Sequence, residues 1–358
     1  MLTLTVASCG AAEKLTTGMK VKSAVEKLGD SPSATVIASV QGSPREAYSF
    51  LEKTRGGSPS HRQAELLSRA ELTLATSSGD PETPLKEMER SDAADVAASL
   101  NFGGPDVAEV RSVGEKVYVR AGPQTLAEQA GGSYRDRQRA AEAVALAGKL
   151  PGSLAAARDA LQGKWVQVNP YAFADFARAA QAMSWEKVPG GGGTVRHAAS
   201  EVSSGLREAS DISSGLNGQA QREFLSGVEK TLADHATFTR AGSRNGADLV
   251  RVGMPARAAA KDLAAALKPL GVRLDPSSVP EKNVSAELSI RRGQLTNLTV
   301  DLGQFTPGGR GAGAHLPLKL SLGGGAAIPV WTSGGAKQLL PQDLVAAAAY
   351  GALGRTAH

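Results

Sequence analysis

The stretch from Asn283 to Leu302 reads NVSAELSIRRGQLTNLTVDL, and most of its apolar residues take every second position on either side of a polar turn. Residues 291–294 reverse the chain between two alternating runs, namely Val284, Ala286, Leu288 and Ile290, then Leu298, Val300 and Leu302. Alternation with a period of two is typical of strands that have one buried and one exposed face. The stretch therefore predicts a β-hairpin that packs one face under another layer.

Further strands are predicted along the chain, most of them by the same alternation. They cover residues 33–41, 70–74, 96–102, 116–120, 237–239 and 316–322. Pro317 indicates an edge position for the last of them, because proline has no N–H to offer a second neighbouring strand. A sheet with unlike faces is expected from this set.

Helices are predicted where apolar residues recur at helical spacing. Two lie near the N-terminus, at 14–28 and 44–54, and three more have the apolar faces Phe173 to Met183, Phe224 to Leu232 and Ala256 to Leu270. These faces supply the layer that the one-faced strands need.

The composition narrows the class of protein. The chain has 358 residues, of which 41% are hydrophobic and 21% charged, and this excludes a disordered chain and a bundle of membrane helices. The net charge of +5 is spread along the sequence. The densest basic stretch, Arg135 to Arg139, is interpreted as a solvated helix face, so no nucleic-acid partner is expected.

The single cysteine, Cys9, excludes an internal disulfide and any zinc site built from several cysteines. It ends the segment Val6-Ala7-Ser8-Cys9, which resembles a bacterial lipobox, the site where a diacylglyceryl group is attached to the thiol. Two acyl chains anchor a protein stably in a membrane. Residues 1–8 lack the basic start and the apolar run of a signal peptide, so we interpret them as a truncated remnant of one. The alternative is an ordinary free thiol.

The search for catalytic groups is mostly negative. None of the five histidines (His61, His197, His235, His315 and His358) pairs with another at the spacing of a helical metal site, so no metal or cofactor is expected. Ser184 and Lys187 match the Ser-x-x-Lys motif of penicillin-recognising enzymes, but the companion motifs are missing. A hydrolase based on these two residues is the third hypothesis, after two that involve no catalysis.

Two short segments carry a family resemblance. Residues 114–120 read GEKVYVR and residues 163–168 read GKWVQV, after a lipobox, a helix and a strand. This layout resembles a group of actinobacterial lipoproteins distantly similar to the LppX/LprG and LolA/LolB lipoprotein-handling folds. The resemblance implies an α+β fold in which a curved antiparallel sheet, an unclosed half-barrel, holds helices on its concave face. The resemblance identifies no ligand-binding residue in this chain.

The domain organisation expected on this basis has three parts. Residues 1–8 are the signal-peptide remnant, residues 9–30 are the anchor tether and first helix, and residues 31–358 form the lipoprotein domain. A glycine- and serine-rich stretch at 189–218 is the candidate position of an internal break in this last domain.

The function expected is that of a non-enzymatic lipoprotein, anchored through Cys9 on the extracytoplasmic face of the cell membrane. Its expected activity is to bind or carry a lipid or another apolar molecule between the sheet and the helices. The alternative is a structural or sensory envelope lipoprotein that binds protein partners through an exposed apolar patch.

Overall fold

A computed structural model describes residues 7–55, 58–88, 94–114, 116–173, 175–176, 218–267, 275–305, 314–324 and 335–356. The chain divides into two compact units, which split the span expected to form one domain. Unit 1 comprises Met1–Ala94 and Leu216–Pro329, and unit 2 comprises Asp95–Gly215 and Val330–His358. The break expected at 189–218 and the helix expected from Phe173 to Met183 lie mostly outside the described residues.

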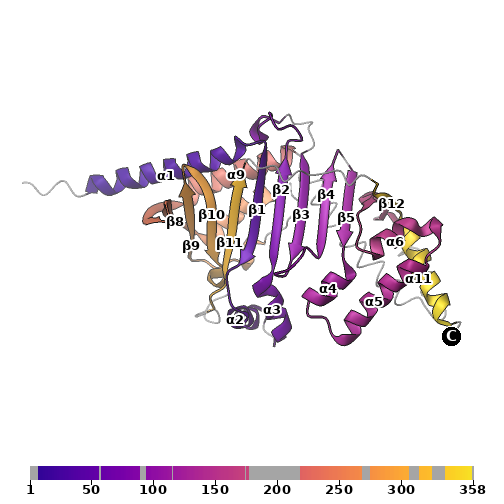
Figure 1. The fold of residues 1–358 in the computed structure, drawn as a ribbon. Coiled ribbons are helices and arrows are strands. Elements are labelled where there is room, and N and C mark those ends of the chain that lie inside the picture. The colour runs from indigo at the N-terminus through magenta and orange to yellow at the C-terminus, as the bar shows by residue number, and fades with distance from the viewer. Residues whose placement is uncertain are drawn as a thin grey trace, which may run out of the picture. The chain divides into compact units, whose positions relative to one another are not determined.

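Unit 1 is a sheet with strand order β2-β1-β11-β10-β9-β8-β7, in which every pair is antiparallel (Figure 1). Its strands are β1 Ser33–Val40, β2 Glu71–Ser77, β7 Thr237–Arg244, β8 Ala247–Pro255, β9 Asn283–Arg291, β10 Gln294–Asp301 and β11 Pro317–Gly324. Its helices are α1 Ala7–Gly29, α2 Pro44–Arg55, α3 His61–Arg69, α9 Gly218–His235 and α10 Ala256–Leu267.

Unit 2 has the strand order β12-β6-β5-β4-β3, with one parallel pair, β6 and β12. Its strands are β3 Asp95–Asn101, β4 Ala108–Val113, β5 Lys116–Ala121, β6 Val166–Val168 and β12 Lys337–Leu339. Its helices are α4 Pro123–Gln129, α5 Tyr134–Lys149, α6 Ala155–Leu161 and α11 Pro341–Thr356. Short 3₁₀ helices complete the two units, at Leu85–Glu87, Gly152–Leu154, Pro276–Ser278 and Leu302–Phe305.

The predicted fold class is confirmed, since helices combine with a curved, mostly antiparallel sheet that does not close. The hairpin expected at 283–302 forms as β9 and β10. Its tight turn places Arg292 at φ 53° and Gly293 at φ 74°. Asn245 and Gly246 turn the chain between β7 and β8 in the same way, at φ 51° and 74°. Positive φ at both central residues matches the right-handed twist of the flanking strands.

Two expectations about local structure are wrong. Pro317 does not mark an edge strand, because β11 pairs with β1 on one side and β10 on the other. Proline is tolerated because it is the first residue of the strand. The tether expected after Cys9 is also absent, since α1 begins at Ala7 rather than near Lys14. Once formed, a helix extends through residues with good helix propensity, such as Ala11 and Ala12, at little cost.

The core of unit 1 lies on one face of its sheet. Val21 and Ala24 of α1 pack on β8, β9 and β10, in a cluster that contains Val250, Val252, Leu288, Ile290 and Leu295. Ala47, Leu51 and Ala64 of α2 and α3 form a second cluster with Leu316, against which Val40 of β1 packs. Unit 2 has its own core, in which residues of β5, β6 and β12 pack with residues of α6 and α11.

Candidate functional site

The strand register places the apolar residues of unit 1 in continuous rows across the sheet. One row runs from β8 to β2 and contains Val250, Leu288, Leu298, Leu320, Ala38 and Leu72. A shorter row beside it contains Leu322, Val36 and Leu74. Since neighbouring strands align these residues directly, all of them belong to the face on which the helices pack.

The helices bury this face unevenly. Val250 and Leu288, beneath α1, are only 2% and 4% exposed. At the other end of the same row Leu72 is 39% exposed, and Leu74 in the shorter row is 40% exposed. Helices therefore cover β8 and β9 closely and leave much of the apolar surface of β2 in contact with solvent.

The exposed surface is an apolar strip on β2, β1 and β11. The strip consists of Leu72 and Leu74 together with their half-buried cross-strand neighbours Val36, Ala38, Leu320 and Leu322. It adjoins both helix clusters, because Leu322 packs against the α1 cluster and Val40, next along β1, packs against the α2 and α3 cluster.

The opposite face of the same strands is mostly polar, although Ile37 and the buried Ala75 belong to it. Between Leu72 and Leu74 lies Thr73, which pairs with Ile37, and one position along Glu71 pairs with Ser39. Lys319 and Ser321 alternate with Leu320 in β11. No charged side chain belongs to the exposed strip. A solvated Leu pair on a sheet face otherwise used for packing is suited to contact an apolar partner.

Cys9, the predicted lipid-attachment residue, lies near the start of α1. The helix passes close to β7, where a Cβ on Gly18 would lie 3.4 Å from the ring of Phe238. At a rise of about 1.5 Å per residue, Cys9 lies about 14 Å along the helix axis from Gly18. The helix that carries the predicted anchor is thus part of the core of unit 1.

The two segments that carry the family resemblance lie in neighbouring strands of unit 2, β5 and β6. Trp165, just before β6, receives two guanidinium groups over its ring, Arg111 at 4.4 Å and Arg120 at 5.5 Å from the centroid. Glu109 forms ion pairs with both arginines. Burial lowers the pKa of Arg111. Each of these three charged side chains has a partner of opposite charge. We therefore interpret the group as one that stabilises the packing of the sheet.

The histidines with described surroundings occupy separate places. His61 stacks on Tyr48 with ring centroids 4.7 Å apart, His235 contacts Asp262 at 2.9 Å, and His315 contacts Asp301 at 2.5 Å. Within the described residues, no group of three or more histidine, cysteine, aspartate or glutamate side chains is placed to hold a metal ion. Ser184 and Lys187 lie outside the described residues, as do His197 and His358.

Sequence reasoning missed the exposed strip, although it predicted the alternation of Leu72 and Leu74. It also missed a set of exposed arginines on β7, β8 and β9, which are far apart in the sequence and close in the sheet. The tight turns at 245–246 and 292–293 mark two hairpins, but the arginines come together through the pairing of β8 with β9, which no local sequence signal indicates.

A scan of protein-family models and a search of curated proteins find no match to this chain. Among the helices that the structure describes, none combines enough length with enough apolar character to cross a bilayer.

Proposed function

We propose that this protein is a lipoprotein of the extracytoplasmic membrane surface, anchored through Cys9, that binds a lipid or another apolar molecule without catalysing a reaction. The apolar strip on β2, β1 and β11 is the proposed contact surface. The observation that carries the proposal is the exposure of Leu72 and Leu74, at 39% and 40%, on the helix-packing face of the sheet.

The geometry of the strip favours an elongated apolar ligand. Its residues span three adjacent strands, and strands lie about 4.8 Å apart, so the apolar surface extends across roughly 10 Å. An acyl chain bound to the strip would contact leucine and valine side chains in place of water. Each square ångström of apolar surface removed from water contributes about 25 cal/mol to the free energy of binding. The clusters under α1 and under α2 and α3 border it on two sides.

The ligand experiment uses the full chain with Cys9→Ser, so that no attached acyl group contributes to binding. Cis-parinaric acid, a fluorescent fatty acid, is titrated into the protein. Saturable binding at a single site is expected. Organic extraction of the protein as purified, followed by mass spectrometry, is expected to release an amphiphile.

A double substitution locates the ligand. Leu72→Gln with Leu74→Gln is expected to weaken binding of the fatty acid about tenfold, because it removes most of the apolar surface that the two side chains offer. Thr73→Gln is the matched control, since Thr73 lies between them on the opposite face. Equal affinities of the double variant and the control would contradict the proposal.

The same experiment tests the alternative, a structural or sensory lipoprotein that binds proteins. That alternative predicts no fatty-acid binding and no extracted amphiphile. Membrane attachment is tested separately, by comparing the native and Cys9→Ser chains for a mass increment of a diacylglyceryl group and for partition into detergent. A native chain without this increment would refute the anchor.

A further inference from the structure

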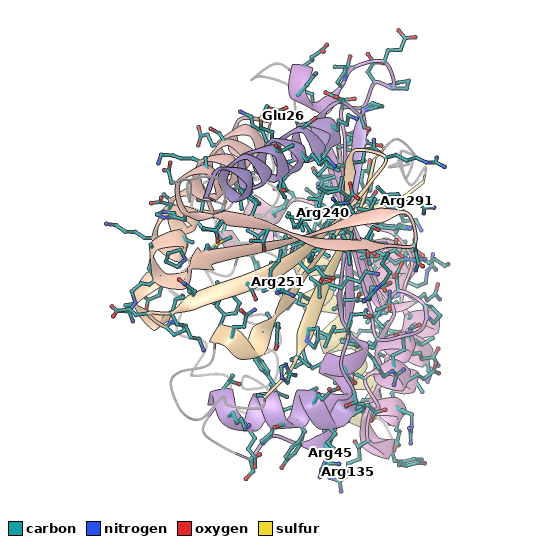
Figure 2. The ribbon with its side chains drawn as sticks, turned by 90° about the vertical axis from the view of Figure 1, so that its left-hand side faces the viewer. Glu26, Arg45, Arg135, Arg240, Arg251 and Arg291 are labelled. Atoms are coloured by element: carbon teal, nitrogen blue, oxygen red, sulfur yellow. The ribbon has the colours of Figure 1, made fainter. Side chains whose placement is uncertain are left out.

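The outer edge of unit 1 carries an excess of positive charge. β7 is the last strand in the order of this unit, and five exposed arginines lie on β7, β8, β9 and the turn that follows, namely Arg240, Arg244, Arg251, Arg291 and Arg292. Figure 2 views the molecule toward this edge, with Arg240, Arg251 and Arg291 labelled. Arg244, Arg291 and Arg292, which lie at the ends of two hairpins, are called the β7 basic surface below.

The pairing of β7 with β8 and of β8 with β9 brings Arg244 and Arg291 together. Arg244 pairs with Ala247, and the next residue of β8, Asp248, pairs with Ile290, which places Arg291 at the neighbouring position of β9. With two strand spacings between them, the backbones at Arg244 and Arg291 lie roughly 10 Å apart. Arg251 pairs with Thr239 of β7 and with Glu287 of β9, so a carboxylate lies directly opposite it. Arg240 pairs with Val250 and therefore lies on the other face of the sheet, on which α1 packs.

Few acidic groups balance this charge. On β7, β8 and β9 the carboxylates are Asp248 and Glu287, and Lys20 of α1 forms an ion pair with Asp248 at 3.2 Å. None of the five arginines forms an ion pair with another residue that the structure describes. All five residues are exposed, so their guanidinium groups offer sites for phosphate oxygens.

The predicted anchor reaches the same edge of unit 1. Helix α1 passes β7 at Gly18, and its earlier residues lead to Cys9, about 14 Å farther along the axis. Arg292 lies in the turn beside Lys27, about 27 Å from Cys9 along the helix axis, so a lipid on Cys9 would hold unit 1 at a bilayer without itself contacting the arginines. An anionic leaflet attracts arginines that lie within about a Debye length, roughly 10 Å at 0.1 M salt.

We infer that the β7 basic surface docks on the headgroups of an anionic phospholipid bilayer and so orients unit 1 on the membrane. The inference builds on the proposed membrane location but involves different residues from the apolar strip. The phosphates of the headgroups accept hydrogen bonds from the guanidinium groups, and no covalent step is involved.

The test measures binding of the full Cys9→Ser chain to sedimented vesicles, so that attachment does not depend on a lipid anchor. Vesicles of phosphatidylglycerol and phosphatidylcholine are expected to bind the protein at low salt, and vesicles of phosphatidylcholine alone to bind it far less. Binding is expected to weaken as salt is added.

A triple substitution, Arg244→Gln with Arg291→Gln and Arg292→Gln, is expected to lower the vesicle partition constant by about fivefold per arginine. The matched control removes the same charge from the exposed arginines of α5, by Arg135→Gln with Arg137→Gln and Arg139→Gln. The control is expected to bind like the parent chain. Circular dichroism checks that both variants are folded.

Two outcomes would overturn the inference. One is the absence of preferential binding to the anionic vesicles. The other is equal loss in the two triple variants, which would show that only the total charge of the chain matters. Failure of the apolar-ligand proposal is recognised separately, because fatty-acid titration reports on Leu72 and Leu74 and not on these arginines.

Discussion

At the scale of single residues, Asp301 organises the junction between β10 and β11. One of its oxygens accepts hydrogen bonds from the backbone N–H groups of Gly303 and Leu316, each at 2.9 Å, and the other contacts His315 at 2.5 Å. Gly303 is required there, since a Cβ would lie 1.7 Å from the carbonyl oxygen of Ala314. Burial acts to raise the pKa of Asp301, but these hydrogen bonds outweigh it and hold the pKa below its ordinary value.

A carboxylate with a lowered pKa makes stability depend on pH in a known direction. The ionised form of Asp301 is favoured in the folded chain, so its contribution is complete above the ordinary aspartate pKa of 3.8 and is lost as pH falls through the lowered value. We expect Asp301→Asn to cost about 1–3 kcal/mol at neutral pH. The difference from the parent chain should shrink in acid, as followed by urea unfolding at several pH values. A difference that is constant with pH would contradict this assignment.

At the scale of elements, the short strand β12 is held by an ion pair as well as by its parallel partner. Lys337 of β12 contacts Asp159 of α6 at 2.5 Å, and Lys164 lies 3.7 Å from the same carboxylate. The hydrogen bond from Lys337 is the main cause that holds the pKa of Asp159 below its ordinary value. The side chain of Asp159 is only 12% exposed, so its charge depends on these partners.

A double-mutant cycle measures this pair. Asp159→Asn and Lys337→Met are each expected to destabilise unit 2, and their coupling energy is expected to be about 1 kcal/mol, obtained from urea unfolding of the parent, single and double variants. The coupling energy should show that the native pair of Asp159 and Lys337 stabilises the fold. Additive effects of the two substitutions would show that the contact does not stabilise the fold.

The elements were predictable to different degrees. Alternation identified β2, β3, β5, β9, β10 and β11, because each has one apolar face. It missed β4, where the two valines, Val110 and Val113, lie on opposite faces and Val113 shares its face with Glu109 and Arg111. It also missed β12, which has three residues. Pro317 was misread because a sequence shows where a strand lacks an N–H but not how many neighbours the strand has.

The candidate site was less predictable than the fold. Leu72 and Leu74 were assigned to an apolar face, but their exposure depends on which helices cover which strands, a property of the tertiary packing. The charge was interpreted as spread along the chain, because 47 positions separate Arg244 from Arg291 in the sequence. Only the pairing of β7 with β8 and of β8 with β9 shows that they are neighbours.

At the scale of the whole molecule, each unit has its own hydrophobic core. Leu288 of β9 and Val166 of β6 are 4% and 1% exposed and belong to different cores. Leu288→Ala is expected to cost about 2–5 kcal/mol, and the smaller Val166→Ala somewhat less. Hydrogen exchange should show faster opening within the substituted unit alone. Faster exchange throughout the chain after either substitution would show that the units open together.

The pairing of β1 with β11 joins distant parts of the chain, since Val40 is the partner of Leu318. During synthesis from the N-terminus, β1 therefore waits for a neighbour that emerges almost 280 residues later. At about 5–20 residues per second this delay is roughly 15–60 s. Throughout that time one edge of β1 lacks its native partner, so a nascent chain is expected to need a binding chaperone to prevent aggregation.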